Sequence, residues 1–316
     1  MSESISRRGL LQYATLAGAG LMTANIAKPA AAKPTADEGH GIRFCFNTST
    51  IRGQNLSIED EIDVAGNAGY SGIEPWVRKI AQYQKDGGKL SDLRKRIADH
   101  GLTVESAIGF AQWIVDDEEK RKKGLEVAKH DMDLVAQIGG TRIAAPPSGN
   151  SEPGLDLFEV AKRYRALLEL GDTMGVTPEL ELWGHSKNLS RLGEVAFVAM
   201  ESGHPKACIM PDVYHVYRGG SDFNALRIIE GSAMPVFHMN DYPADPPRET
   251  INDSHRVYPG DGIAPLSQII RDIHDRGFRG ALSLELFNKE YWKQDPNAVA
   301  KVGLEKMQAE VQKALA

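Results

Sequence analysis

Short apolar runs alternate with helical stretches along nearly the whole chain after residue 41, and this alternation restricts the possible folds more than any other feature. The predicted strands span residues 42–48, 70–76, 102–110, 141–145, 177–183, 207–212, 235–240 and 281–287. The predicted helices span residues 58–68, 90–100, 117–138, 156–174, 189–202, 222–229, 265–276 and 299–315. Strict alternation requires a parallel sheet with helices on its faces. With about 35 residues per strand–helix unit, we expect a (β/α)8 TIM barrel, as a single domain over residues 41–316.

A doubly wound open sheet is the alternative arrangement for alternating strands and helices. Such a sheet normally has a glycine-rich turn after an early strand, where it binds phosphate groups. The first predicted strand here ends in Asn47, Thr48, Ser49 and Thr50, and no such turn follows. The sequence therefore favours the closed barrel.

The first 32 residues are similar to a twin-arginine export signal. The sequence SRRGLL at residues 6–11 contains Arg7 and Arg8, a weakly apolar stretch follows at residues 13–27, and three alanines at residues 30–32 resemble a cleavage site. A transmembrane anchor needs roughly 20 consecutive apolar residues, more than this interrupted stretch offers. We expect a signal peptide at residues 1–32, a polar tether at residues 33–40, and export to the periplasm by the twin-arginine machinery. Retention as an uncleaved anchor remains the alternative.

The charge balance excludes one class of partner. The formal net charge is −6, and it becomes −8 when residues 1–32, which carry +2, are removed. An acidic chain of this kind is a poor nucleic-acid binder. The two cysteines, Cys45 and Cys208, lie in apolar runs far apart in the sequence. We expect them to be buried thiols, although an oxidising compartment would permit a disulfide.

Four consecutive predicted strands end in side chains that can bind a metal ion. These side chains are Glu181, Asp212, His238 and Glu285. In a barrel the carboxyl ends of the strands form the active face, so all four would meet at one rim. Like charges there raise one another's pKa, and a divalent cation removes this conflict. Three carboxylates and one imidazole suit Mn²⁺, Mg²⁺ or Co²⁺, and also Zn²⁺. For a single glutamate, pairing with an arginine or a backbone amide is the plain structural alternative.

The segments around these four residues resemble the xylose-isomerase-like TIM-barrel superfamily of sugar isomerases and epimerases, which includes inosose dehydratase and hydroxypyruvate isomerase. The matching segments are LELWGH at 180–185, DVYH at 212–215, FHMND at 237–241 and LSLELF at 282–287. Glu74 also matches a glutamate after the family's second strand. Arg256, with the PGDG sequence at residues 259–262, is similar to the loop after the seventh strand.

The resemblance implies a metal ion held by Glu181, Asp212, His238 and Glu285. It also implies a metal-stabilised enediolate, in which one of Glu181 and Glu285 removes a proton and the other returns one. The expected activity is isomerisation or epimerisation of a small sugar. Loss of a β-substituent from the same intermediate would instead give a lyase or dehydratase acting on a keto-sugar or keto-glycoside, and the residues do not separate the two reactions.

Further residues near these ligands are candidates for substrate contacts. They are Glu74, Trp183, His185, His215 and Arg256. His215 could instead cap a helix, Arg256 could form a surface ion pair, and Asn240 and Asp241 could orient His238. An endonuclease of the same superfamily would need more histidines and a basic groove, and a non-catalytic sugar-binding barrel would be expected to lose one of the glutamates. The identity of the sugar and the formation of a homo-oligomer remain open.

Overall fold

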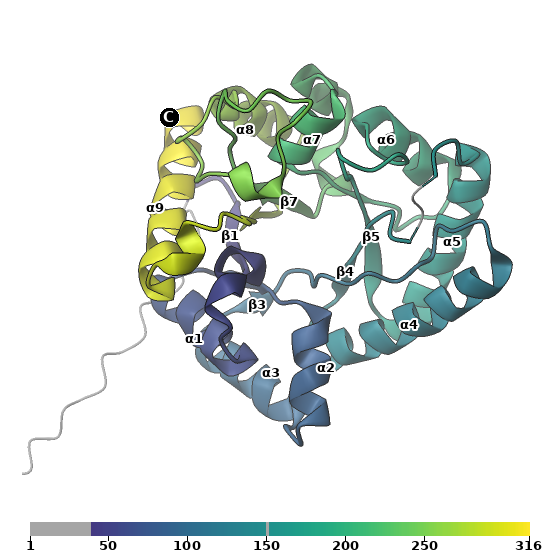
Figure 1. Ribbon diagram of the computed structural model, residues 1–316, viewed down its shortest axis with the longest axis horizontal. Coiled ribbons are helices and arrows are strands. Elements are labelled where there is room, and N and C mark those ends of the chain that lie inside the picture. The colour runs from purple at the N-terminus through teal and green to yellow at the C-terminus, as the bar shows by residue number, and fades with distance from the viewer. Residues whose placement is uncertain (1–38, 150–151) are drawn as a thin grey trace, which may run out of the picture. The chain divides into compact units, whose positions relative to one another are not determined.

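The computed structural model describes residues 39–149 and 152–316. Within these ranges, strands and helices alternate along the chain (Figure 1). The strands are β1 (Arg43–Asn47), β2 (Gly72–Glu74), β3 (Thr103–Val104), β4 (Arg142–Ala145), β5 (Thr177–Glu181), β6 (Ile209–Met210), β7 (Val236–Met239) and β8 (Ala281–Leu284). The α-helices are α1 (Ile58–Ala68), α2 (Val77–Lys85), α3 (Leu90–Asp99), α4 (Glu118–Gln137), α5 (Leu157–Met174), α6 (Leu192–Glu201), α7 (Val213–Gly219), α8 (Leu266–Asp275) and α9 (Pro296–Leu315). Short 3₁₀ helices are η1 (Thr48–Gln54), η2 (Phe223–Ile228), η3 (Gly231–Ala233), η4 (Asp253–His255) and η5 (Tyr291–Lys293).

The strands form a closed ring. One run of parallel neighbours has the order β3-β2-β1-β8-β7 and the other has the order β4-β5-β6. Two hydrogen bonds link the runs: the amide of Ala144 donates to the carbonyl of Ala107, and that of His238 donates to the carbonyl of Pro211, each at 2.9 Å. The helices surround this ring (Figure 1). The predicted (β/α)8 TIM barrel is therefore confirmed.

Alternation along each strand divides the apolar residues into two clusters. The larger cluster, which includes Phe44, Phe46 and Leu180, lies between the strands and the helices. The smaller cluster, which includes Cys45 and Met210, fills the inside of the ring. On β5 this alternation turns Leu180 outward, so its neighbours Glu179 and Glu181 face the barrel interior.

Capping residues explain where the helices begin and end. The Ser57 side chain accepts from the Asp60 amide at the start of α1, and the Asp156 side chain accepts from the Phe158 amide at the start of α5. Gly69 and Gly175 follow these two helices with φ angles of 96° and 68°, which glycine adopts without steric cost. These local signals mark the boundaries between helix and strand.

Several elements differ from the sequence-based expectation. The third strand is Thr103–Val104 rather than residues 102–110, and only one isolated bridge, between Trp76 and Ile108, extends its pairing. Residues 222–229 form the 3₁₀ helix η2 rather than an α-helix. The short helices η1, α2 and α7 were not predicted, because seven to nine residues give too little periodicity to recognise.

Both cysteines are free and buried, which confirms the predicted thiols. The predicted signal peptide at residues 1–32 lies outside the described residues, as does most of the predicted tether at residues 33–40. Among the described residues, no helix combines the length and apolar character needed to cross a bilayer.

Candidate active site

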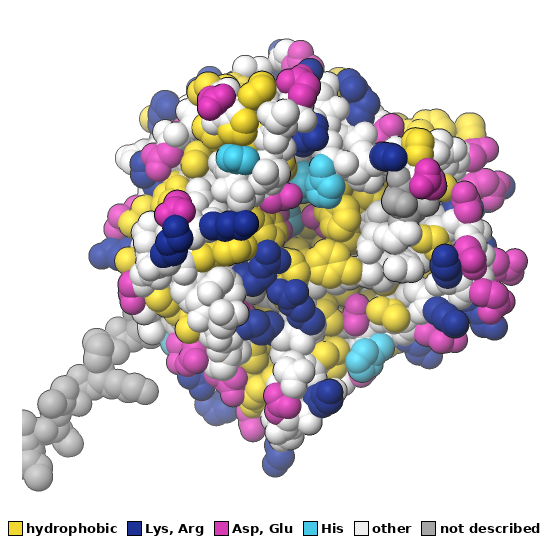
Figure 2. All heavy atoms as spheres, in the orientation of Figure 1, with side chains coloured by type: hydrophobic (Ala, Val, Ile, Leu, Met, Phe, Trp, Pro, Cys, Tyr) yellow, Lys and Arg dark blue, Asp and Glu magenta, His cyan; other side chains and the backbone are white. Residues whose placement is uncertain are grey.

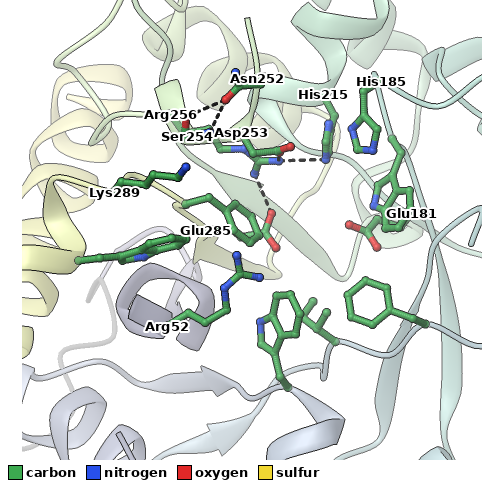
Figure 3. A pocket seen from close by; sticks show the side chains of 16 residues that line it. Arg52, Glu181, His185, His215, Asn252, Asp253, Ser254, Arg256, Glu285 and Lys289 are labelled. Atoms are coloured by element: carbon green, nitrogen blue, oxygen red, sulfur yellow. Dashed lines mark hydrogen bonds and ion pairs between the residues drawn. The ribbon is translucent and has the colours of Figure 1, made fainter. Parts of the chain in front are cut away.

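A cavity of about 430 Å³ opens at the carboxyl ends of the strands. Its wall combines carboxylates, basic groups and histidines with a set of aromatic rings. Figure 2 shows this face hollowed at its centre, with apolar, histidine and basic side chains around the hollow. Figure 3 shows the side chains that line the cavity, among them Glu181 and Glu285, which enter it from different strands. The cavity therefore lies at the rim of the barrel where the sequence analysis predicted that the polar residues at the strand ends would meet.

Three of the four predicted metal ligands meet beside this cavity. Asp212, His238 and Glu285 each offer a donor atom, and these atoms lie within 4.8 Å of one another. The Nδ1 atom of His238 is 3.3 Å from Oε2 of Glu285 and 3.8 Å from Oδ2 of Asp212. Asp212 and His238 are completely buried, and Glu285 is 3% exposed. Two carboxylate oxygens and an imidazole nitrogen in this arrangement can hold a divalent cation.

A buried nitrogen that makes no hydrogen bond supports the fit of a metal ion. Nδ1 of His238 makes no hydrogen bond, whereas Nε2 of the same ring lies 3.1 Å from Oε2 of Glu74. In metal sites a histidine ligand commonly donates its second ring N–H to a carboxylate, which fixes the orientation of the ring. Burial alone would lower the pKa of His238, but the carboxylates of Glu285 and Glu74 outweigh it and raise that pKa. A bound cation would replace the additional proton at Nδ1.

Glu74 does not lie where the sequence-based prediction of a substrate contact requires. Its side chain is completely buried and is not part of the cavity wall. It accepts hydrogen bonds from Ser283 Oγ at 2.7 Å and from Asn47 Nδ2 at 2.9 Å, in addition to its contact with His238. Glu74 therefore positions His238 from behind the cavity.

Glu181, the fourth predicted ligand, faces this cluster across the cavity. It is the last residue of β5, it is 4% exposed, and it lies outside the group of three close donors. Figure 3 shows its carboxylate pointing toward Glu285. Burial, with a further contribution from the Glu285 carboxylate, raises the pKa of Glu181 to about 8. A buried carboxyl group with such a pKa is suited to proton transfer near neutral pH.

Arg256 is completely buried and joins the ligand carboxylates to one another. Its Nη1 atom donates to Glu285 Oε2 at 2.7 Å and to Asp212 Oδ2 at 2.9 Å. Its Nη2 atom donates to Asp253 Oδ1 at 2.6 Å and lies 3.0 Å from His215 Nε2. The alternative of a surface ion pair is therefore wrong. A cation that binds Asp212 and Glu285 would share with Arg256 the oxygens that the guanidinium now bridges.

Asn240 and Asp241 were expected to orient His238, but their hydrogen bonds go to other groups. Asn240 donates to Asp212 Oδ2 at 2.9 Å and accepts from the Tyr214 amide at 2.9 Å, so it orients Asp212 and the start of α7. Asp241 accepts from the amides of Gly260, Gly262 and Ala264, so it holds the loop after β7. The expectation for these residues was wrong because their side chains point toward the following loop and helix.

His185, His215 and Trp183 all line the cavity, as do Glu181 and Arg256. His185 stacks on the Trp183 ring, with 5.3 Å between ring centroids and 26° between the planes. Burial and then the Arg256 charge hold the pKa of His215 well below its usual range, so this imidazole is neutral. Its Nε2 can then accept from Arg256, and the amide of the same residue donates to Asp212 Oδ1 at 2.7 Å. His215 thus lies both at the start of α7 and in the cavity wall.

The sequence analysis missed several other wall residues, notably Arg52, Phe287, Lys289 and Trp292. All four follow β1 or β8, whose loops open on the active face. Their position in these loops was the available signal. Without a carboxylate or histidine pattern, however, they do not stand out from other loop residues.

Comparison with known proteins places this chain in a family. The family sequence profile described as xylose isomerase-like TIM barrel matches residues 62–310. An inosose isomerase from Bacillus velezensis is 25% identical over 277 residues, covering 86% of this chain and 98% of that protein. A fructoselysine 3-epimerase from Escherichia coli O157:H7 is 25% identical over 268 residues, covering 81% and 94% of the two chains. A 3-dehydroshikimate dehydratase from Pseudomonas putida is 22% identical over 233 residues, covering 73% of this chain and 36% of that protein.

A solved structure agrees with the fold. The structure of the IOLI protein with a zinc atom superimposes with a TM-score of 0.79 and 22% sequence identity, and the match covers 87% of this chain and 99% of that one. The relatives are enzymes, and they include an isomerase, an epimerase and a dehydratase. The profile match extends over most of the chain, from α1 to α9. The protein described here therefore belongs to the xylose isomerase-like TIM barrel family.

Proposed function

We propose that this protein is a divalent-metal-dependent sugar isomerase or epimerase that moves a proton next to a carbonyl group. The observation that carries the proposal is the pair of buried glutamates, Glu181 and Glu285, that face each other across one cavity (Figure 3). Moving a proton on a small substrate requires acid–base groups within reach of the reacting carbons. The isomerase and epimerase among the relatives support this assignment.

The proposed metal ligands are Asp212, His238, Glu285 and Glu181. A divalent cation held by these residues would supply Lewis-acid chemistry, which favours negative charge on the oxygen of the substrate carbonyl. Nδ1 of His238, which makes no hydrogen bond and faces the carboxylates of Asp212 and Glu285, supports this assignment, and so does the zinc in the solved structure of similar fold. Mn²⁺, Mg²⁺ and Co²⁺ also suit oxygen-rich sites with one imidazole.

The surrounding residues have separate roles in this proposal. Glu181 and Glu285 exchange protons with the substrate carbon, one removing a proton and the other returning one. His215 and Arg256 are assigned to the substrate-binding wall because both line the cavity, where Arg256 also holds the carboxylates of Asp212 and Glu285 in place. Trp183, stacked on His185, offers an apolar surface to the sugar ring.

A keto-sugar or keto-glycoside lyase is the second candidate function. The dehydratase among the relatives favours it. Once a proton has left the carbon next to a carbonyl, loss of a β-substituent competes with reprotonation. The same two glutamates would serve both outcomes, so the residues alone do not distinguish them.

The test is hydrogen exchange at carbon. Metal-loaded protein is incubated in D₂O with a panel of neutral ketoses, sugar acids and 3-keto-glycosides, and NMR follows deuterium bound to carbon. Deuterium uptake without loss of a substituent supports the isomerase or epimerase, whereas an unsaturated product supports the lyase. Absence of exchange with every compound, in protein shown to bind metal, would rule out both. The His238→Gln variant controls for metal-independent exchange.

One further proposal concerns the protein in its cell. We propose that residues 1–32 direct export by the twin-arginine machinery to the periplasm, on the basis of Arg7, Arg8 and the alanines at residues 30–32. An exported enzyme meets free or glycosidic sugars more often than phosphorylated ones. The metal site, which assembles with the fold, suits a route that moves folded proteins.

A further inference from the structure

Arg52 points into the cavity and has an unusual set of neighbours (Figure 3). Its guanidinium carbon lies 5.1 Å from the ring centroids of Trp76, Phe287 and Trp292. Its side chain is half-buried, and among the described residues no carboxylate lies within ion-pair distance of it. The aromatic rings therefore hold a cation that has no charged partner of its own.

The nearby carboxylates are already committed to another cation. Asp253 and Glu285 both line the cavity, and both accept from Arg256, at 2.6 Å and 2.7 Å. Lys289 also lines the cavity and points into it (Figure 3), and no carboxylate among the described residues pairs with it. This side of the cavity therefore has two cationic side chains that form no ion pair with a described carboxylate, although the charges of Glu285 and Asp253 act on Arg52 from a greater distance.

A third cation increases the positive charge around Arg52. The guanidinium of Arg78 lies 4.3 Å from the centroid of the Trp76 ring, the same ring that Arg52 contacts. Burial, followed by repulsion from Arg78, lowers the pKa of Arg52. An anion bound at Arg52 would relieve both effects, because it restores solvation lost on burial and offsets the neighbouring charge.

We propose that Arg52 and Lys289 form a subsite for a carboxylate group of the substrate, so that the enzyme acts on sugar acids. This inference rests on the proposed function, whose substrate class it narrows. Aromatic rings surround the guanidinium of Arg52, so its N–H groups are left as its means of binding a partner. A guanidinium presents these donors in a fork that matches the two oxygens of a carboxylate. The reacting carbons would then lie between Glu181 and Glu285, with the carboxylate at the opposite end of the substrate.

The surroundings favour a carboxylate over a phosphate group. Phosphate sites commonly use several backbone N–H groups at a helix N-terminus or in a glycine-rich loop. Here the donors are two separate side chains, and the neighbouring wall consists of apolar rings such as Trp76 and Phe287. A planar group with a single charge fits between such rings with less desolvation than a doubly charged phosphate.

The experiment compares matched ligands that differ only in one anionic group. Calorimetric titration of metal-loaded protein uses D-glucitol as the neutral polyol, D-gluconate as the carboxylate and D-glucitol 6-phosphate as the phosphate. The same titrations are made with Arg52→Met, with the charge-retaining variant Arg52→Lys, and with Arg78→Met as a control. Arg78 contacts the Trp76 ring but is exposed and does not line the cavity.

We expect wild-type protein to bind gluconate about tenfold or more tightly than glucitol, because a charge-assisted pair at a half-buried arginine is a strong interaction. Arg52→Met should remove most of this preference without changing glucitol binding, Arg52→Lys should retain part of it, and Arg78→Met should retain most of it, because Arg78 adds only a neighbouring charge and no contact in the cavity. Equal binding of gluconate and glucitol by wild-type protein, or no binding of either, overturns the proposal. A preference for the phosphate, or equal losses for both ligands in Arg52→Met, overturns it as well. The titrations measure binding without turnover, so they test this inference separately from the proposed function. If NMR finds carbon-bound deuterium in neutral ketoses but in no sugar acid, this inference is wrong and the proposed function still holds.

Discussion

The Nε2 atom of His238 lies 3.1 Å from Oε2 of Glu74, and both side chains are completely buried. Ser283 and Asn47 hold the Glu74 carboxylate in turn, so a chain of hydrogen bonds that starts on β1 and β8 fixes the imidazole on β7. This arrangement directs Nδ1 of His238 toward Asp212 and Glu285. Residues on the strands of the barrel therefore set the orientation of His238, the proposed metal ligand, independently of the loops.

Glu74→Gln should weaken metal binding. The amide keeps the shape of the side chain but loses the negative charge that holds the Nε2 proton, so the ring becomes a poorer ligand. Loss of such a supporting carboxylate typically lowers metal affinity roughly 10–100-fold. Competition with a chromogenic chelator measures the change. Glu105→Gln is the matched control, because Glu105 is also a buried barrel carboxylate but bonds to Arg43 at 2.7 Å. Equal metal affinity in Glu74→Gln and wild type would contradict the assignment.

The two glutamates of the cavity should respond differently to substitution. Glu285 belongs to the close group with Asp212 and His238, whereas Glu181 faces that group from across the cavity. Glu285→Gln should therefore reduce metal affinity and carbon-bound deuterium exchange together. Glu181→Gln should reduce exchange by about 100-fold or more, the scale of general acid–base catalysis, with a smaller loss of metal affinity. Chelator competition and NMR on the same samples check both effects, and the reverse order of metal losses would argue against this division.

The sequence predicted the fold and the rim of the barrel well, because these depend on repeated and local signals. Strand–helix alternation gave the closed barrel, and the last polar residue of each strand gave Glu181, Asp212, His238 and Glu285. The structure brings three of these together and places the fourth opposite them. Their use as metal ligands and catalysts remains a prediction.

The remaining features depend on side-chain directions that a linear pattern does not contain. Glu74 is the last residue of β2 and Glu285 comes directly after β8, yet Glu74 lies behind His238 and does not line the cavity. Arg256 comes from a long loop, and only its three-dimensional position reveals that it bridges Asp212 and Glu285. Arg52 lies in the short helix η1, where one arginine among polar loop residues carries no distinctive signal.

Asp131→Asn should stabilise the protein near neutral pH. Asp131 lies on α4 beside a small cavity, and burial raises its pKa from 3.8 to about 6. The unfolded chain releases this proton near pH 4 while the folded chain retains it until about pH 6, so stability is lost as the pH rises through this window. The variant removes that cost above pH 6 but offers no such advantage below pH 4. Melting temperatures at acidic and neutral pH measure the difference, and Asp133→Asn, an exposed change on the same helix, is the control. An equal gain in melting temperature at both pH values would mean that the ionisation of Asp131 is not the cause.

Replacement of both arginines of the proposed export signal by lysine should block export. The pair Arg7→Lys and Arg8→Lys keeps the charge of the segment, so a loss of export would reflect recognition of the arginines themselves. Fractionation of cells should then find the wild-type chain in the periplasm, and the variant retained in the cytoplasm with residues 1–32 uncleaved. If the variant reached the periplasm in the same amount as wild type, the proposal of twin-arginine export would be wrong.

Arg256→Met should destabilise metal-free protein far more than metal-loaded protein. The guanidinium balances three carboxylates, those of Asp212, Asp253 and Glu285, and the first of these is completely buried. Removing one partner of a buried ion pair typically costs about 3–5 kcal/mol, which corresponds to a drop of roughly 10 °C in melting temperature for a domain of this size. A divalent cation on Asp212 and Glu285 would restore most of the missing positive charge. Excess Zn²⁺ or Mn²⁺ should therefore raise the melting temperature of the variant by more than that of wild type.

The controls separate charge balance from packing in this last experiment. Arg43→Met removes another barrel arginine, which pairs with the buried Glu105 and with none of the proposed ligands, so metal should not rescue it. Scanning calorimetry of wild type and both variants, with and without metal, gives the six melting temperatures needed. An equal drop for Arg256→Met in the presence and absence of metal would mean that the cation does not share the Asp212 and Glu285 oxygens with this guanidinium. Metal rescue confined to Arg256→Met would instead locate the bound ion at the oxygens that Arg256 bridges.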